Sequence, residues 1–220
     1  MNAPLKSEIT PLFAVPLAQF HLPQPERLCA DLRSLFLERE QQGDDVRNEI
    51  RRPTQAAEVF ESRFDLFTWD DRPVVALRDY CHASLLTLLK HLGQVDEQSN
   101  VKIDYHSWFH ITRRGGYQGM HNHQNASWSG IFCVDPGDRV PDKPRSGVVR
   151  FHDPKFGTNM FADPANRALP MPFNNGVYEV HHRAGTLTIF PSYLNHEIFA
   201  YEGERERIVV AFNSWATQLA

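Results

Sequence analysis

The feature that most restricts the fold of this 220-residue chain is a change of hydrophobic period near residue 100. Before that point apolar residues recur at helical spacing, and after it they alternate with polar residues as in half-buried strands. Short strand-like segments separated by Gly, Pro and Asp then follow one another: 101–112, 128–134, 146–153, 176–181, 185–192, 196–201 and 205–213. Such a series is typical of an antiparallel sandwich or barrel.

The first hundred residues predict mainly helix. Apolar residues at helical spacing predict one helix over 25–42 and a clearer one over 72–92, for which Asp71 is the expected N-cap. A loosely alternating segment over 11–20 predicts an edge strand, and residues 44–70 are polar and irregular. We expect the helices to cover the outer face of one sheet.

The bulk composition indicates one globular domain over 1–220, in which 1–100 support a β core over 101–216. A net charge of −4 gives no general attraction to nucleic acid or anionic membranes. No apolar run reaches the roughly 18 residues of a membrane span, and prolines and charges interrupt the N-terminus, unlike a signal peptide. Cys29, Cys81 and Cys133 lie on apolar patterns and predict buried thiols in the cytoplasm.

A pair of histidines stands out in the stretch GGYQGMHNHQNASWSG, where His121 and His123 are two residues apart. In an extended chain residues i and i+2 share a face, so the two imidazoles could bind one metal ion. A third histidine, His196, begins the predicted strand 196–201 after a turn at Pro191.

A charged stretch, YEGERER, follows His196 and predicts a hairpin with a two-residue type II′ turn at 203–204. In that register Arg207 opposes Ala200 and shares a face with His196, about 13 Å along the strands. A metal ion at His196 and the guanidinium of Arg207 would then lie at the two ends of a space suited to a small dicarboxylate. Alternatively, Arg205 and Arg207 are surface charges in a Glu–Arg ladder.

These stretches, together with GVVRFHDP, resemble the 2-oxoglutarate and Fe(II)-dependent dioxygenases. More closely, residues 101–214 are similar to a bacterial and phage branch of uncharacterised 2OG-Fe(II) oxygenases. The resemblance implies a mainly β fold with N-terminal helices, whose core is a double-stranded β-helix (jelly-roll, cupin-like). It also implies Fe(II) and 2-oxoglutarate as cofactor and co-substrate.

The resemblance further implies an enzyme that oxidises an unknown substrate, with oxidative decarboxylation of 2-oxoglutarate to succinate. Fe(II) would be held by His121, His123 and His196, with no catalytic residue beyond this metal site, and Arg207 would bind the distal carboxylate of 2-oxoglutarate. The family usually has a carboxylate where this chain has His123. The site is then a triad of three histidines, which we favour, or another group such as Asp153 or Glu197 completes it.

A second departure is Val209, which stands where many relatives have a serine that contacts the co-substrate. Three polar residues are candidates to replace that contact: Tyr117, Ser129 and Asn213. For the substrate pocket the candidates are Trp108, His110 and Trp128, although a polar outer face with a covering tryptophan is the alternative.

Two other functions stay open on these residues. One is a cupin-like three-histidine dioxygenase or isomerase that does not use 2-oxoglutarate, and the other is a non-catalytic binding module. The expected partner is a small-molecule or peptide substrate rather than nucleic acid or membrane, and a homodimer is an open alternative to a monomer.

Overall fold

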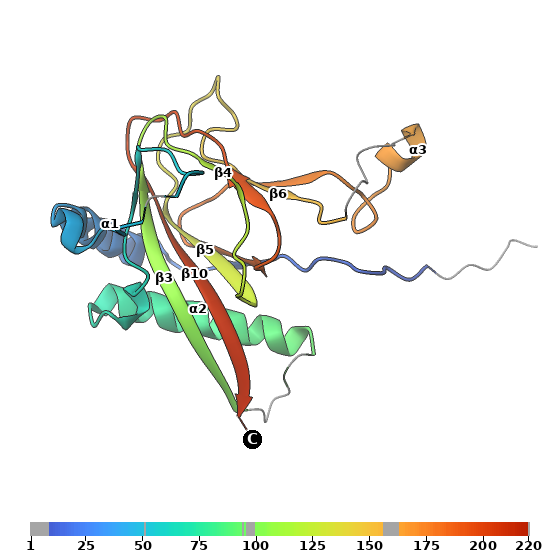
Figure 1. The fold of residues 1–220 in the computed structure, drawn as a ribbon, viewed down its shortest axis with the longest axis horizontal. Coiled ribbons are helices and arrows are strands. Elements are labelled where there is room, and N and C mark those ends of the chain that lie inside the picture. The colour runs from blue at the N-terminus through green and yellow to red at the C-terminus, as the bar shows by residue number, and fades with distance from the viewer. Residues whose placement is uncertain (1–8, 51, 94, 96–99, 156–162, 220) are drawn as a thin grey trace, which may run out of the picture.

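The computed structural model describes residues 9–50, 52–93, 95, 100–155 and 163–219. Within them two antiparallel sheets face each other, and the two long helices, α1 and α2, cover the outer face of the larger one (Figure 1). The elements in chain order are β1 Ala18–His21, α1 Glu26–Glu40, β2 Val59–Glu61, α2 Arg72–His91, β3 Asn100–Thr112, β4 Gln118–His121, β5 Trp128–Asp135, β6 Val149–His152, α3 Pro164–Arg167, β7 Val177–Val180, β8 Thr186–Pro191, β9 His196–Ile198 and β10 Arg207–Leu219.

The larger sheet has the strand order β1-β8-β5-β10-β3-β2, and the smaller sheet has the order β4-β9-β6-β7. The long strands β3 and β10 pair along their whole lengths, which Figure 1 shows as a ribbon running down to the C-terminus. The predicted mainly β fold with N-terminal helices is thus confirmed. The division of the chain into supporting and core segments near residue 100 stays a prediction.

The two long helices form because each presents one apolar stripe to the larger sheet. Leu32 and Phe36 of α1 and Leu77 and Leu85 of α2 are fully buried in the cluster between helices and sheet. Asp71 does precede α2, but its carboxylate pairs with Arg39 and makes no cap with its side chain. The backbone carbonyl of Asp71 accepts the first helical hydrogen bonds instead.

Successive side chains of β10 point to opposite faces of the larger sheet. Ile208, Val210 and Phe212 point into the cluster beneath the helices. Arg207 and Val209 point the other way, into the space between the two sheets. One strand therefore contributes both to the hydrophobic core and to the candidate site.

The predicted hairpin over 196–213 is wrong. β9 pairs with β4 and β6 of the smaller sheet, whereas β10 pairs with β3 and β5 of the larger one. The chain between them crosses from one sheet to the other, so the register that aligned Ala200 with Arg207 does not exist. Arg205 lies on the surface and pairs with Asp135 and Asp138.

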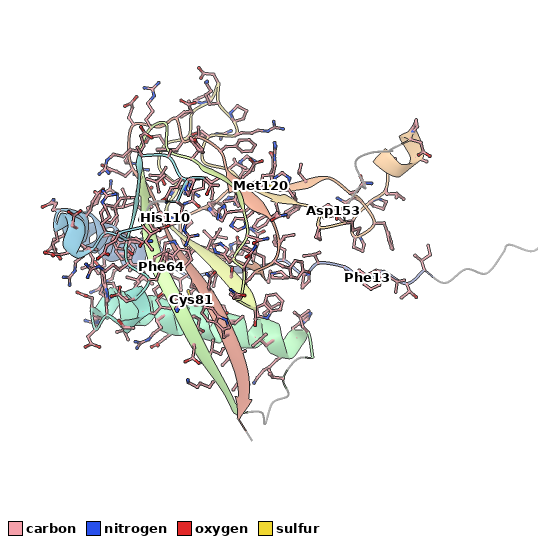
Figure 2. The ribbon with its side chains drawn as sticks, viewed as in Figure 1. Phe13, Phe64, Cys81, His110, Met120 and Asp153 are labelled. Atoms are coloured by element: carbon pink, nitrogen blue, oxygen red, sulfur yellow. The ribbon has the colours of Figure 1, made fainter. Side chains whose placement is uncertain are left out.

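Two further departures lie in the N-terminal part. Only the end of the predicted strand 11–20 pairs in a sheet, as β1 beside β8, and Phe13 lies on a segment that extends away from the body (Figure 2). Residues 44–70 are not wholly irregular, because β2 pairs with β3 and Gln55 forms an isolated bridge with Gln118 of β4. This segment therefore reaches the smaller sheet as well as the larger one.

The three cysteines are free and buried, as predicted. Burial raises the pKa of the Cys29 thiol to about 11 and that of Cys133 to about 12. In the described part of the chain, no helix has the length and apolar character needed to cross a bilayer.

Candidate metal centre and its cavity

The three histidines of the predicted ligand set lie together between the sheets. His121 ends β4 and His196 begins β9, and the two are Cα partners across the antiparallel pair. His123 follows β4 by two residues, and its backbone N–H donates to the carbonyl of Ser192 at 2.9 Å. One ring nitrogen from each histidine can be chosen so that all three lie within 4.8 Å of one another.

The hydrogen bonds of two of these rings determine their tautomers. Nδ1 of His121 lies 2.7 Å from the carbonyl oxygen of Gly119, and Nδ1 of His196 lies 3.0 Å from that of Leu194. A carbonyl only accepts, so each Nδ1 carries the proton and each Nε2 keeps a free lone pair. A backbone carbonyl bound in this way is the usual orienting partner of a metal-binding histidine.

Electrostatics keep the cluster neutral. Burial lowers the pKa of His123 to about 2 and that of His196 to about 3, and it lowers the pKa of His121 as well. The rings therefore stay uncharged at neutral pH, each with one nitrogen lone pair available. This donor set, neutral imidazoles in a shielded site, fits a divalent transition metal such as Fe(II).

Neither of the alternative carboxylates joins the three histidines. Glu197 pairs with Arg150 and His152, on the far side of the β9 backbone from His196. Asp153 lines a separate groove and accepts from the backbone N–H of Lys155. Figure 2 shows Asp153 toward α3, whereas His110 lies beside the long strands. Within the described residues the metal-binding group consists of histidines alone.

Arg207 lines the same cavity as the three histidines, although the register that predicted this was wrong. The residue is 3% exposed, and among the described residues no carboxylate lies within 4 Å of its guanidinium. Among the described residues its side chain makes one hydrogen bond, from Nη2 to Nδ1 of His182 at 3.1 Å. Burial lowers the pKa of Arg207, but a guanidinium stays charged in proteins, so within the described part of the chain this is a buried cation without a counter-ion.

The wall of the cavity differs from one side to the other. Apolar side chains from both sheets line one part of it: Ile131, Val149, Ile198 and Val209. The polar side chains of the lining, here called the polar wall, are Arg52, Thr54, Gln55, Glu61, His110 and Gln118. Trp108 lies on the inner face of β3 with His110, and its ring centroid is 5.8 Å from that of His123.

Nε2 of His110, on the polar wall, has four polar neighbours within 3.5 Å, and the two nearest compete for it. Nε2 of His110 lies 2.8 Å from Oε2 of Glu61 and 3.1 Å from Nε1 of Trp108. Burial would raise the pKa of Glu61, but hydrogen bonds from His110 and Asn48 outweigh it and lower the pKa, so the group is a carboxylate. Nε2 of His110 must then donate to Glu61, which leaves the indole N–H of Trp108 without an acceptor among the residues that the structure describes.

Several predicted contacts are not in the cavity. The three candidates to replace the serine contact are elsewhere: Tyr117 is 46% exposed, and Ser129 hydrogen-bonds to Ser192 and Asn213. Asn213 shares a strand face with Arg207 but lies six residues along, about 20 Å away at the usual strand rise. Trp128 is buried in the cluster under the helices rather than in the pocket wall.

The residues that sequence analysis missed come mainly from the segment between the helices. Glu61 is 5% exposed and reaches the cavity because β2 pairs with β3, where Glu61 opposes His110. Gln55 and Gln118 meet at the isolated bridge between that segment and β4. The only local signal was the short apolar run before Glu61, too short to show which strand it would join.

Comparison with known proteins agrees with this geometry. Residues 106–213, which include all three histidines and Arg207, match a family model described as "Putative 2OG-Fe(II) oxygenase". None of the curated proteins matches the chain. The match and the fold point to one class: over these residues the chain is similar to the 2-oxoglutarate- and Fe(II)-dependent oxygenases, and its fold is the double-stranded β-helix. The resemblance drawn from the sequence, with its two cofactors, is confirmed over these residues.

Solved structures share the fold at low sequence identity. A prolyl-4-hydroxylase from Pseudomonas putida superposes with a TM-score of 0.62 and 15% identity, covering 91% of this chain and 92% of that one. A prolyl hydroxylase from Trichoplax adhaerens, in complex with a hypoxia inducible factor peptide, has a TM-score of 0.61 and 10% identity, covering 90% and 83%. HygX from Streptomyces hygroscopicus, with nickel, 2-oxoglutarate and hygromycin B bound, has a TM-score of 0.55 and 12% identity, covering 91% and 83%.

Proposed function

We propose that this protein uses Fe(II) and 2-oxoglutarate to oxidise a second, polar substrate. The balanced reaction consumes 2-oxoglutarate, O₂ and a substrate C–H bond, and it yields succinate, CO₂ and the hydroxylated product. When bound, Fe(II) supplies the redox chemistry with O₂ that amino-acid side chains lack. His121, His123 and His196 are the residues that would hold it.

The observation that carries the proposal is Arg207. A buried guanidinium without a carboxylate partner is costly, and proteins retain such a charge where it binds an anion. This one opens into the cavity that holds the three histidines. A dicarboxylate with one end at the metal and the other paired bidentately with Arg207 satisfies both features at once.

The chain's own groups then orient and shield the reactants. Arg207 fixes the distal carboxylate of 2-oxoglutarate, while Val209 and Ile198 keep water from that pair and so strengthen it. The keto-acid end of 2-oxoglutarate then faces the three histidines. The apolar side of the cavity thereby becomes the co-substrate half of the site.

The polar wall is the substrate half. The unpaired indole N–H of Trp108 and the side-chain amides of Gln55 and Gln118 can donate to oxygen atoms of a bound molecule. We therefore assign Trp108 and His110 to substrate binding, and we propose a small molecule or peptide with oxygen acceptors near the oxidised carbon. The solved neighbours include one with a peptide and one with hygromycin B, so the fold accommodates either kind.

The test is an anaerobic titration of the purified protein with Fe(II) and then 2-oxoglutarate. We expect the weak visible charge-transfer band of the iron–2-oxoglutarate chelate, which should be lost in His196→Ala. His91→Ala, which changes an exposed histidine at the end of α2, is the matched control and should keep the band. A wild-type protein that binds neither metal nor 2-oxoglutarate would be a binding module, and the proposal would be rejected.

The same titration distinguishes the proposed function from the cupin-like alternative. A three-histidine enzyme that does not use 2-oxoglutarate would bind Fe(II) but show no band on addition of the keto acid. Succinate release under air, measured with and without 2-oxoglutarate, gives an independent reading of the same question. Metal binding without either response would favour the alternative.

A further inference from the structure

The strongest unexplained feature outside the metal group is the imidazole that contacts Arg207. His182 lies between β7 and β8, and its Nδ1 is 3.1 Å from Nη2 of Arg207. Arginine has donors only, so Nδ1 of His182 must be the acceptor and its proton must lie on Nε2. The geometry therefore determines one neutral tautomer of this ring.

The surroundings keep His182 in that state. Burial and the charge of Arg207 lower the pKa of His182 to about 3, so the ring is uncharged at neutral pH. The residue as a whole is partly exposed, but its Nε2 is shielded from solvent and has no hydrogen-bond partner among the described residues. A buried donor left unpaired costs about 1–3 kcal/mol, which a side chain with no role beyond packing would avoid.

A second residue restricts the guanidinium from the other side. Gly147 has φ +66°, and a Cβ built there would lie 2.9 Å from Cδ of Arg207 and 3.1 Å from its Nε. Only the absence of a side chain at Gly147 lets the arginine stem pass this close. Gly147 thus makes room for the stem of Arg207, and His182 holds Nη2 with a neutral acceptor that does not cancel the charge of the guanidinium.

We propose that His182 is a positioning residue for the co-substrate, which acts by orienting Arg207 toward the distal carboxylate of 2-oxoglutarate. A carboxylate at the position of His182 would neutralise Arg207 and compete with the co-substrate. A neutral imidazole instead orients the guanidinium and leaves its charge available to the co-substrate. This inference rests on the proposed function, because it presumes that Arg207 binds 2-oxoglutarate.

The test compares His182→Leu with His182→Asn, because the Asn Oδ1 can take the place of the Nδ1 acceptor and Leu cannot. Binding of 2-oxoglutarate to the Zn(II)-loaded protein is measured by calorimetry, and Zn(II) binding itself reports an intact metal site. We expect His182→Leu to weaken 2-oxoglutarate binding about tenfold, the loss of one hydrogen bond to a charged group. His182→Asn should remain within about threefold of wild type, as should His181→Leu at the exposed neighbouring histidine.

The kinetic counterpart is a selective effect on the co-substrate. In His182→Leu the KM for 2-oxoglutarate should rise about tenfold, while kcat at saturating 2-oxoglutarate stays near that of wild type. Equal 2-oxoglutarate affinities in wild type and His182→Leu would overturn the inference and leave the proposed function standing. Equal losses of 2-oxoglutarate affinity in His182→Leu and His182→Asn would also overturn the inference, because altered packing would then explain the effect. A wild type that binds Zn(II) but no 2-oxoglutarate would reject both.

Discussion

Replacing Arg207 by methionine should stabilise the co-substrate-free protein and abolish its response to 2-oxoglutarate. Like arginine, methionine has a long unbranched side chain, but it carries no charge. Removing a buried guanidinium that has no counter-ion recovers several kcal/mol of desolvation free energy. Against this, Nδ1 of His182 loses its donor, at a cost of about 1–3 kcal/mol. The desolvation term is larger, so we expect a net gain of about 1–3 kcal/mol in unfolding free energy.

The effect on binding has the opposite sign. Truncating one partner of a buried, hydrogen-bonded charge pair costs about 2–5 kcal/mol, which corresponds to a roughly 30-fold to 4,000-fold loss of affinity for 2-oxoglutarate. In wild type, 2-oxoglutarate at about 100 times its Kd should add about 2.7 kcal/mol of stability. The Arg207→Met variant should show little of that gain at the same concentration.

Urea unfolding of the Zn(II)-loaded protein, with and without 2-oxoglutarate, measures both effects. The control is Arg205→Met, which removes a 52% exposed arginine paired with Asp135 and Asp138. This surface change should alter stability by about 1 kcal/mol or less and leave 2-oxoglutarate binding unchanged. An Arg207→Met protein that is destabilised yet still binds 2-oxoglutarate would refute the reasoning, because Arg207 would then be a structural charge with an adequate partner.

Three further predictions concern the same cavity. His123→Asp restores the carboxylate that the family usually has and adds one negative charge, so chelator competition should show equal or tighter Fe(II) binding; loss of binding would contradict the assignment of His123 as a ligand. Burial depresses the pKa values of His123 and His196 below the ordinary 6.5, so the unfolded chain takes up protons that the folded one does not. Metal-free protein should therefore lose stability as pH falls below about 6.5, by about 2 kcal/mol per histidine at pH 5, and urea midpoints that do not change between pH 7 and pH 5 would exclude this. Gly147→Ala should weaken 2-oxoglutarate binding without affecting Zn(II) affinity, because the new methyl group displaces Arg207; unchanged calorimetric affinity for 2-oxoglutarate would show that the arginine can adjust.

Local residue patterns were enough to predict the elements and the chemistry of the metal group. The alternation after residue 100 predicts strands because a half-buried strand must present one apolar face, and most of those segments are strands in the structure. His121 and His123 are close in sequence, so an extended chain brings them to one face whatever the rest of the fold does. His196 could be added because it follows a buried strand and a turn.

Pairing between strands was not predictable in the same way. The hairpin over 196–213 followed from local turn chemistry, but β9 and β10 belong to different sheets, and the chain crosses from one sheet to the other between them. Arg207 faces the cavity for another reason than the predicted one: the alternation of β10 buries Ile208 under the helices and turns Arg207 inward. A sequence carries the period of a strand but not the identity of its neighbour.

The sequence by itself predicted the class of fold and proposed the three imidazoles and the arginine as site residues, because alternation within strands and the H-x-H spacing depend on residue type and local spacing. Only the tertiary structure decided what surrounds them. Glu61 and Gln55 join the polar wall through long-range pairing, and His182 contacts Arg207 from 25 positions earlier in the sequence. Tyr117, Ser129 and Asn213 do not line the cavity for the same reason, since proximity across sheets is set by packing that no local pattern encodes.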